Sequence, residues 1–393
     1  KASWDEAYNI IKSKIENTSK EKICGFIGDL INMETSFIFK EFFERTIDSN
    51  KYESRSKQNF IDNSVRENYL FNSTINGIEE TDLILLIGTN PRYEATMVNA
   101  RIRKTYLNNR TKIISVNDVG DLTYAYDFLD GKTQTIKDIV ENNNEISKKI
   151  IDSKKPMIIL GESFFNIKSA NYLFQSLKKF LKENNKITNE WNPLNILSTD
   201  AARVGNFDLD IVNMKDDLIG DLKENKFELI YLLGQDNLDF RKKNEFVIYQ
   251  GSHGDKGAEI ADIILPGAAY TEQSAYFTNL EGKIQKAYKA SYPPGEAKED
   301  WQIINELAEM MNNRKLFNDK DELESSMLNF LNLKKEKQKH EFIKETNQNN
   351  FENENLEVKF KDYYFSNVIA RSSKTMLDCY NSKFGIKRTG TEG

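Results

Sequence analysis

The stretch from Val247 to Tyr288, VIYQGSHGDKGAEIADIILPGAAYTEQSAYFTNLEGKIQKAY, carries the strongest fold signal in this chain. Short apolar runs alternate in it with glycine turns, and Pro266 ends the run Ile263–Leu265. Such a stretch presents small residues and backbone groups at strand ends, which is where open α/β sheets hold nucleotide-like ligands. It therefore predicts an α/β protein with a crevice at the strand ends.

The rest of the chain alternates expected strands with expected helices. Continuous apolar runs such as 83–87 are typical of parallel strands that are buried on both faces. Strands are predicted at 23–27, 83–88, 113–116, 157–160, 194–197, 229–233, 246–249 and 260–265, and helices at 4–15, 37–47, 94–107, 136–150, 170–181 and 301–311. Ser3 and Glu6 have capping-box spacing at the start of the first helix. This alternation predicts parallel βαβ units with right-handed crossovers.

Two segments far apart in the chain echo one another. Residues 83–91 read LILLIGTNP and residues 229–237 read LIYLLGQDN, each an apolar strand followed by a glycine and a polar turn. We interpret them as two Rossmann-like lobes with parallel sheets that face one another, the first at 1–150 and the second at 151–312. The alternative is that the two segments are alike only because parallel strands commonly end in a glycine and a polar turn, and that they indicate no paired lobes.

The composition changes after residue 312. Residues 334–340 form a charge run and residues 346–357 are rich in Asn and Glu, which predicts a solvated linker. Apolar periodicity returns at 363–380, with Ser366 as a candidate cap. We therefore expect a charged linker and a helical C-terminal tail over 313–393, whose helix docks on its own core or on a neighbouring subunit.

Composition narrows the classes of partner. The chain has 393 residues, 39% hydrophobic and 30% charged, which is typical of a soluble globular protein of two domains. Its net charge of -6 argues against nucleic acid as a partner, because phosphate binding needs concentrated positive charge. Its apolar runs are all shorter than the roughly 18–20 residues that span a bilayer, so we expect no direct membrane insertion.

Metal ligands are scarce. The two cysteines, Cys24 and Cys379, lie too far apart in the chain for the close spacing that iron–sulfur clusters use, and each is expected to be a packing residue. His253, in a glycine-rich turn, is interpreted as hydrogen-bonded to backbone rather than as a proton-handling residue, and His340 as solvated. We therefore predict no metal site and no catalytic residues in this chain.

Familiar nucleotide and hydrolase motifs are missing from the sequence: GxSxG, the P-loop, and a GxGxxG that opens a helix. Two turns remain as candidates. Gly88, Asn90 and Pro91 follow a buried strand and begin a helix, which makes a natural anion site. Residues 261–282 include Asp262, Pro266 and Glu272. Either turn could line a crevice between the lobes, or both could simply close strands.

Several quoted segments resemble the molybdopterin oxidoreductase superfamily. SWDEA at 3–7, GTNP at 88–91 and ADIILP at 261–266 resemble its motifs. More narrowly, YLFNSTINGIE at 69–79, GSHGD at 251–255, PGAAYTE at 266–272 and PPGEAKEDW at 293–301 resemble the family of the large iron–sulfur subunit of respiratory complex I. These segments agree in order over most of residues 1–312, and the closing helix is also similar to the C-terminus of that family.

The resemblance implies two lobes of the formate dehydrogenase type and a role in electron transfer from NADH to quinone. It also implies N-terminal domains with [2Fe–2S] and [4Fe–4S] clusters, which this chain lacks, as it lacks the metal-binding Cys of catalytic molybdoenzymes and their β-barrel. The family's crevice turns, here Gly88, Asn90, Pro91, Asp262, Pro266 and Glu272, are then expected to be vestigial and to hold no cofactor.

The leading hypothesis is a non-catalytic scaffold among peripheral-arm subunits of complex I, on the cytoplasmic face of a bacterial inner membrane or on the mitochondrial matrix side. The alternatives are an active molybdopterin-dependent oxidoreductase, with Asn90 and Asp262 near the cofactor, and a nucleotide-binding regulatory module that uses the crevice.

Overall fold

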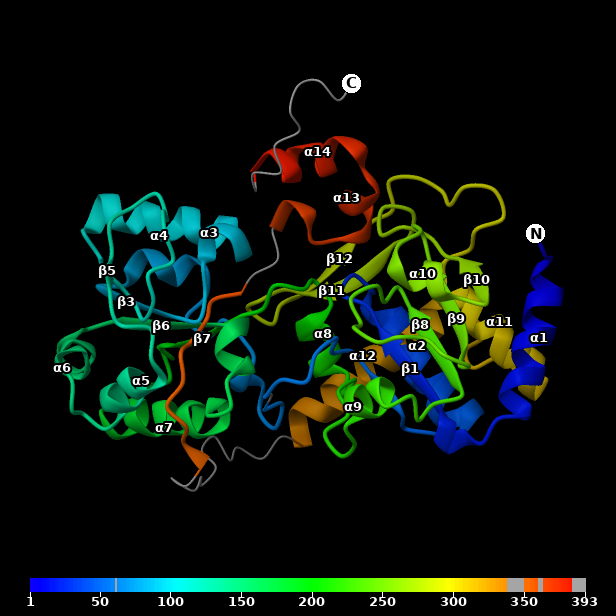
Figure 1. The fold of residues 1–393 in the computed structure, drawn as a ribbon, viewed down its shortest axis with the longest axis horizontal. Coiled ribbons are helices and arrows are strands. Elements are labelled where there is room, and N and C mark those ends of the chain that lie inside the picture. The colour runs from blue at the N-terminus through cyan, green and yellow to red at the C-terminus, as the bar shows by residue number, and fades with distance from the viewer. Residues whose placement is uncertain (61, 338–349, 360–362, 384–393) are drawn as a thin grey trace.

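Two five-stranded parallel sheets organise the protein in a computed structural model, which describes residues 1–60, 62–337, 350–359 and 363–383 (Figure 1). Sheet A has the order β10-β9-β8-β1-β2 and contains β1 (Ile23–Ile27), β2 (Tyr52–Glu53), β8 (Leu229–Leu233), β9 (Phe246–Gly251) and β10 (Ile263–Pro266). Sheet B has the order β5-β4-β3-β6-β7 and contains β3 (Leu83–Ile87), β4 (Lys112–Ser115), β5 (Asp127–Phe128), β6 (Pro156–Gly161) and β7 (Leu194–Leu197). The predicted α/β class with two parallel-sheet lobes is confirmed.

The two sheets are not divided at residue 150. β1 pairs with β8 from Ile23↔Leu229 to Ile27↔Leu233, and β6 pairs with β3, so each sheet takes strands from both 1–150 and 151–312. The grouping of strands in the prediction is therefore corrected: the chain leaves sheet A after β2, builds all of sheet B, and returns with β8. The physical reason is that β3 and β8 are buried on both faces and each needs a parallel neighbour on either side.

Helices cover both faces of each sheet and bury four apolar clusters against them. The longer helices are α1 (Trp4–Glu16), α2 (Met33–Phe42), α4 (Thr96–Asn109), α5 (Thr133–Val140), α6 (Glu145–Asp152), α7 (Ala170–Glu183), α11 (Asp300–Asn312), α12 (Lys320–Lys337) and α14 (Lys374–Lys383). The shorter ones are α3 (Pro91–Glu94), α8 (Arg203–Asp208), α9 (Leu218–Lys223), α10 (Lys256–Ile260) and α13 (Val368–Ser372). A hairpin of β11 (Ala275–Thr278) and β12 (Ile284–Ala287) projects between the lobes (Figure 1).

Local capping explains where helices begin and where one prediction was wrong. Ser3 caps α1 by accepting a hydrogen bond from the Glu6 amide at 3.2 Å, as expected. The single helix predicted at 136–150 is instead α5 and α6. Asn142 adopts a left-handed conformation (φ 60°) and Asn144 caps the second helix, and both are conformations that asparagine favours.

The echo between the two segments has a structural basis at two glycine pairs. β3 and β8 are each the third strand of their sheet and each is followed by a glycine with positive φ, Gly88 (65°) and Gly234 (56°). A Cβ on Gly161 would lie 2.4 Å from the carbonyl oxygen of Gly88, and one on Gly28 would lie 1.7 Å from that of Gly234. Each lobe therefore needs glycine where its two central strands end side by side.

The region after residue 312 differs from the predicted linker. α12 packs against α2, and Lys334, in the predicted charge run, donates to the carbonyl of Phe207 at 2.7 Å. Residues 350–359 lie extended along sheet B. There Asn355 forms an antiparallel β-bridge with Lys132, and the Leu356 side chain is 1% exposed. The terminal helix is split into α13 and α14, and its cap is Asn367 rather than Ser366. His340 and residues 338–349 lie outside the described residues.

Candidate functional site

Cavities lie at the carboxyl edges of both sheets, where doubly wound folds hold ligands. The cavity of sheet A, about 380 Å³, is lined by residues that follow β1, β8 and β9, and by 199–201, which follow β7 of the other sheet. The carboxyl edges of the two lobes therefore face one another across it. The cavity of sheet B, about 710 Å³, is lined by Asn90 after β3, 117–119 after β4, and 130–131 after β5.

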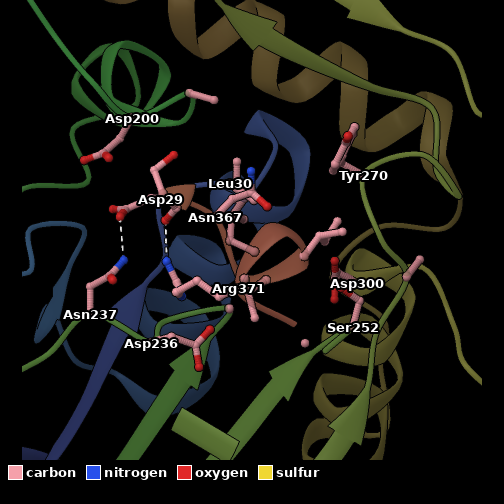
Figure 2. A pocket seen from close by; sticks show the side chains of 18 of the residues that line it. Asp29, Leu30, Asp200, Asp236, Asn237, Ser252, Tyr270, Asp300, Asn367 and Arg371 are labelled. Carbon is pink, nitrogen blue, oxygen red and sulfur yellow. Dashed lines mark hydrogen bonds between the residues drawn. The ribbon is translucent and has the colours of Figure 1, made fainter. Parts of the chain in front are cut away.

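The cavity of sheet A is acidic, and its acids are already engaged. Asp29, Asp200, Asp236 and Asp300 line it (Figure 2). Each accepts hydrogen bonds from protein groups at 2.6–3.0 Å. The donors are Asn237 for Asp29, Arg203 for Asp200, the Gly257 amide and Tyr249 hydroxyl for Asp236, and Gln250 and Gln273 for Asp300. Burial raises the pKa of Asp300 to about 6 and raises the pKa of Asp236 as well.

The C-terminal tail occupies the mouth of this cavity. Arg371 of α13 points into it (Figure 2), and its guanidinium Nε donates to Asp255, outside that lining, at 2.6 Å. The same guanidinium donates to the carbonyl of Ser366, and Asn367 caps α13 through the Ala370 amide at 2.9 Å. A cation from the chain's own tail therefore lies at this acidic cavity, in addition to Arg203.

At sheet B, the predicted anion site is filled by an internal carboxylate. Glu94 accepts from the Asn90 amide at 2.6 Å and from the Thr89 hydroxyl at 2.5 Å. Asn90 caps α3 through the Arg92 amide, and Pro91 is the first residue of that helix, as the sequence predicted. Burial raises the pKa of Glu94 to about 7. The donors that would hold a ligand anion are therefore satisfied from within the turn.

The tail also covers this second cavity. Residues 355–359 form one wall of it. The Leu356 amide donates to the carbonyl of Gly131 at 2.8 Å, and the Lys359 amide donates to the Ser163 hydroxyl at 2.8 Å. The tail thus reaches the carboxyl edges of both sheets. It is described at 350–359 and again from residue 363.

The second group of predicted turn residues lies elsewhere. Asp262 precedes β10, at the amino edge of sheet A, where it accepts from the Val247 amide at 2.8 Å and pairs with Lys242 at 2.7 Å. Pro266 ends β10 and lines, with Asp262, a separate groove beside α1. Glu272 closes a turn by accepting from the Ala269 amide at 2.9 Å. The structure does not bring these residues together with Asn90 in one cavity.

The remaining candidates have local roles. His253 Nδ1 lies 2.9 Å from the Ser252 hydroxyl, and its carbonyl accepts from Tyr249. Cys24 is buried in β1, and burial raises the pKa of its thiol well above the ordinary value, whereas Cys379 is exposed on α14. Among the residues that the structure describes, no cluster of three or more His, Cys, Asp or Glu could hold a metal ion. No helix in that part of the chain is long and apolar enough to cross a membrane.

Sequence reasoning missed the most consequential residues of the site, Glu94 and Arg371. Glu94 lies in the first turn after Pro91, a position where acids are common at helix starts, so its spacing was a usable signal. Arg371 gave no such signal, because its partner Asp255 lies 116 positions away in the sequence. Asp236 belonged to the polar turn of the echo and could have been named with it.

The fold and the site define a class of protein: two doubly wound α/β lobes whose carboxyl edges face one another across ligand-sized cavities. Within that class, the comparison with family models is decisive. The chain belongs to the molybdopterin oxidoreductase family, whose model matches residues 1–310. Residues 324–379 match a second family, described as the C-terminal part of the G subunit of NADH-ubiquinone oxidoreductase.

Similar proteins agree with both matches. The chain is 37% identical to the NADH-ubiquinone oxidoreductase 75 kDa subunit of Reclinomonas americana, over 96% of this chain and 58% of that protein. It is 36% identical to the G subunit of NADH-quinone oxidoreductase from Rickettsia bellii, over 99% of this chain and 57% of that protein. The chain therefore spans somewhat more than half the length of these relatives. A chain of the formyltransferase/hydrolase complex of Methylorubrum extorquens shares the fold, with a TM-score of 0.58, 11% identity, and coverage of 80% of this chain and 97% of that one.

The residues present do not fit the cofactor that the family name implies. A pterin dinucleotide carries phosphates, which need backbone N–H groups or cations. Here Glu94 occupies the amide donor after β3, and four carboxylates line the cavity of sheet A. The tail lines both cavities, with Arg371 at sheet A and with residues 355–359 at sheet B. The acidic lining of one cavity and the engaged donors of the other thus oppose an anionic dinucleotide.

Proposed function

We propose that this chain is a scaffold domain of the large iron–sulfur subunit of NADH:quinone oxidoreductase, respiratory complex I. In this role it binds no redox centre and supports electron transfer from NADH to quinone by holding cluster-bearing domains in place. Electron transfer needs short, fixed distances between centres, so a rigid non-catalytic domain contributes through its packing and its interfaces. The six turn residues Gly88, Asn90, Pro91, Asp262, Pro266 and Glu272 are then inherited structural turns.

One observation carries the proposal. The part of the chain that matches the C-terminal family of this complex I subunit, 324–379, contains the segments that lie over both crevices. A tail of that family and a usable pterin site therefore compete for the same space. The identity to complex I relatives over 96% and 99% of the chain supports the same assignment.

We infer the rest of the assembly from the relatives. They are longer than this chain, and we propose that [2Fe–2S] and [4Fe–4S] clusters belong to the part of the relatives' length that this chain does not cover. The partners would be other peripheral-arm subunits, and the location would be the cytoplasmic face of a bacterial inner membrane or the mitochondrial matrix side. Attachment to the membrane would come through the complex.

Affinity purification tests this function. A tag on the C-terminus of the native protein should recover, from membranes solubilised in mild detergent, the other complex I subunits together with NADH-driven quinone reduction. A matched control carries the same tag on an unrelated soluble protein and should recover neither. Recovery of the tagged protein without those partners, with formate-driven reduction of an artificial dye, would contradict the proposal.

A further inference from the structure

A third cavity, of about 40 Å³, lies where the two lobes meet. Three buried side-chain atoms of its lining residues, Asn59 Oδ1, Asn68 Nδ2 and Ser198 Oγ, find no hydrogen-bonding partner among the described residues. Such atoms are rare in folded proteins, because burying a polar atom without a partner costs free energy. Their convergence on one cavity points to a ligand rather than to three independent defects.

The orientation of Asn68 is fixed. The side chain is 3% exposed, and its Oδ1 accepts from the ammonium of Lys178 at 2.9 Å. Exchanging the amide oxygen and nitrogen would point an NH₂ group at that ammonium, so Nδ2 is the atom left without a protein acceptor. The residues that line the cavity thus carry one unpartnered donor, on Asn68, one unpartnered acceptor, on Asn59, and the Ser198 hydroxyl, which can be either.

The cavity lies at both crossings of the chain between the sheets. Asn59 and Asn68 belong to the segment that runs from β2 of sheet A to β3 of sheet B. Ser198, Arg203 and Phe207 belong to the segment that returns from β7 to β8. Whatever fills this cavity bridges the two connections between the lobes.

We propose that this interlobe cavity binds ordered water, which links the two crossing segments by hydrogen bonds. A water molecule needs about 10–15 Å³ and two to four polar partners, and the cavity offers more space and three partners. Water is also both donor and acceptor, as this set requires. The lining carries charges of both signs, Asp62 and Glu162 beside Arg203, and the unpartnered atoms call for a donor and an acceptor together, which water supplies and a simple inorganic ion does not.

The sign of a stability change tests the proposal. If water is bound, Ser198→Ala removes one of its partners, and we expect the thermal midpoint of the full chain to fall by about 1–2 °C. If the cavity is dry, the same change deletes a buried hydroxyl that has no partner, and the midpoint should rise. Thr81→Val is the matched control, because the Thr81 hydroxyl is also unpartnered among the described residues but lines none of the three cavities. We expect its midpoint to rise or stay unchanged.

High-resolution density supplies a second, independent test. We expect a peak within hydrogen-bonding distance of Asn68 Nδ2 and Ser198 Oγ that is unchanged when sodium salts are replaced by rubidium salts. A peak that strengthens with rubidium would identify a cation and overturn the proposal. An empty cavity together with a raised midpoint for Ser198→Ala would overturn it as well.

Discussion

Glu94 shows how one side chain can close a ligand site. Its carboxylate takes the donors of the turn after β3, at the cost of being buried. A carboxylic acid with a raised pKa in the folded protein keeps its proton more tightly when folded. Its contribution to stability is therefore fully present below its unfolded pKa and is lost as pH rises through its folded pKa.

We predict a pH-dependent effect of Glu94→Gln. Burial raises the pKa of Glu94 from 4.5 to about 7, so the wild-type protein should lose stability relative to this variant as pH rises from 5 to 8. At 1.36 kcal/mol per pKa unit, the loss is on the order of 3 kcal/mol. Urea unfolding of both proteins across this range measures it. Two profiles that run parallel from pH 5 to 8 would contradict the assignment.

The position of Gly28 requires glycine for a steric reason. A Cβ at this position would lie 1.7 Å from the carbonyl oxygen of Gly234, and both atoms belong to rigid strand ends. We predict that Gly28→Ala costs more than about 3 kcal/mol of unfolding free energy or abolishes soluble expression. Gly254→Ala is the control, since a Cβ there meets no atom within 4 Å. Equal midpoints for the two variants in urea would show that the strand ends are not as close as described.

At the scale of elements, the strands were the part of the fold that sequence could predict. The predicted bounds of Leu194–Leu197 and Leu229–Leu233 match the structure at both ends. The second is an unbroken apolar run between Glu228 and Gly234, and the first has three apolar residues around the buried Asn195. β2 was missed: it has two residues, and one of them, Glu53, is buried by its ion pair with Arg55 at 2.6 Å. A search for apolar runs cannot detect such a strand, because a buried charged residue reads as a loop residue in the sequence.

The tail could not be predicted for a related reason. Residues 350–359 are held mainly by backbone groups and by the hydroxyls of Thr133, Ser163 and Ser169. Such anchors lie far away in sequence, so the segment's own polar composition indicated a solvated linker. The site had the same limit: Asn90 and Pro91 were correctly placed at a helix start, but the residues that close the crevices come from elsewhere in the chain.

Leu356 is the apolar anchor of this segment. It is 1% exposed and packs in the apolar cluster of sheet B. We predict that Leu356→Ala costs about 2–5 kcal/mol of local stability and speeds protease cleavage within 350–359. Limited proteolysis with mass spectrometry checks this. The neighbour Glu357, which is exposed, provides the control variant Glu357→Ala. Unchanged cleavage of the Leu356 variant would mean that the segment is not held at this point.

Arg371 is the polar anchor of α13. Its ion pair with Asp255 is about three-quarters buried on both sides, with side-chain exposures of 23% and 19%. We predict that Arg371→Ala raises amide hydrogen exchange in 363–383 several-fold while the exchange of β8 is unchanged, since a partly buried pair contributes on the order of 1 kcal/mol. Lys374→Ala, an exposed position on α14, is the control. Equal exchange in the two variants would contradict a docked tail.

In the molecule as a whole, the C-terminal tail contacts both lobes and so connects the two sheets. It contacts the lobe of sheet A through Arg371 and the lobe of sheet B through residues 355–359, and the ammonium of Lys383 lies 4.3 Å from the ring centroid of Tyr93. Figure 1 shows α13 and α14 above the region where the two lobes meet. A scaffold gains from this arrangement, because fixing the lobes to one another also fixes any domain attached to them.

We expect this domain to hold no metallopterin, because the donors of the turn after β3 are engaged and the cavity of sheet A is acidic. Elemental analysis for molybdenum and tungsten, with extraction and oxidation of any pterin to its fluorescent form, tests this on the native protein purified through its tag. We expect neither metal nor pterin above background, with a known molybdoenzyme as the positive control. About one molybdenum or tungsten and its pterin per copy of this chain, lost on substitution of residues at the crevices, would contradict it.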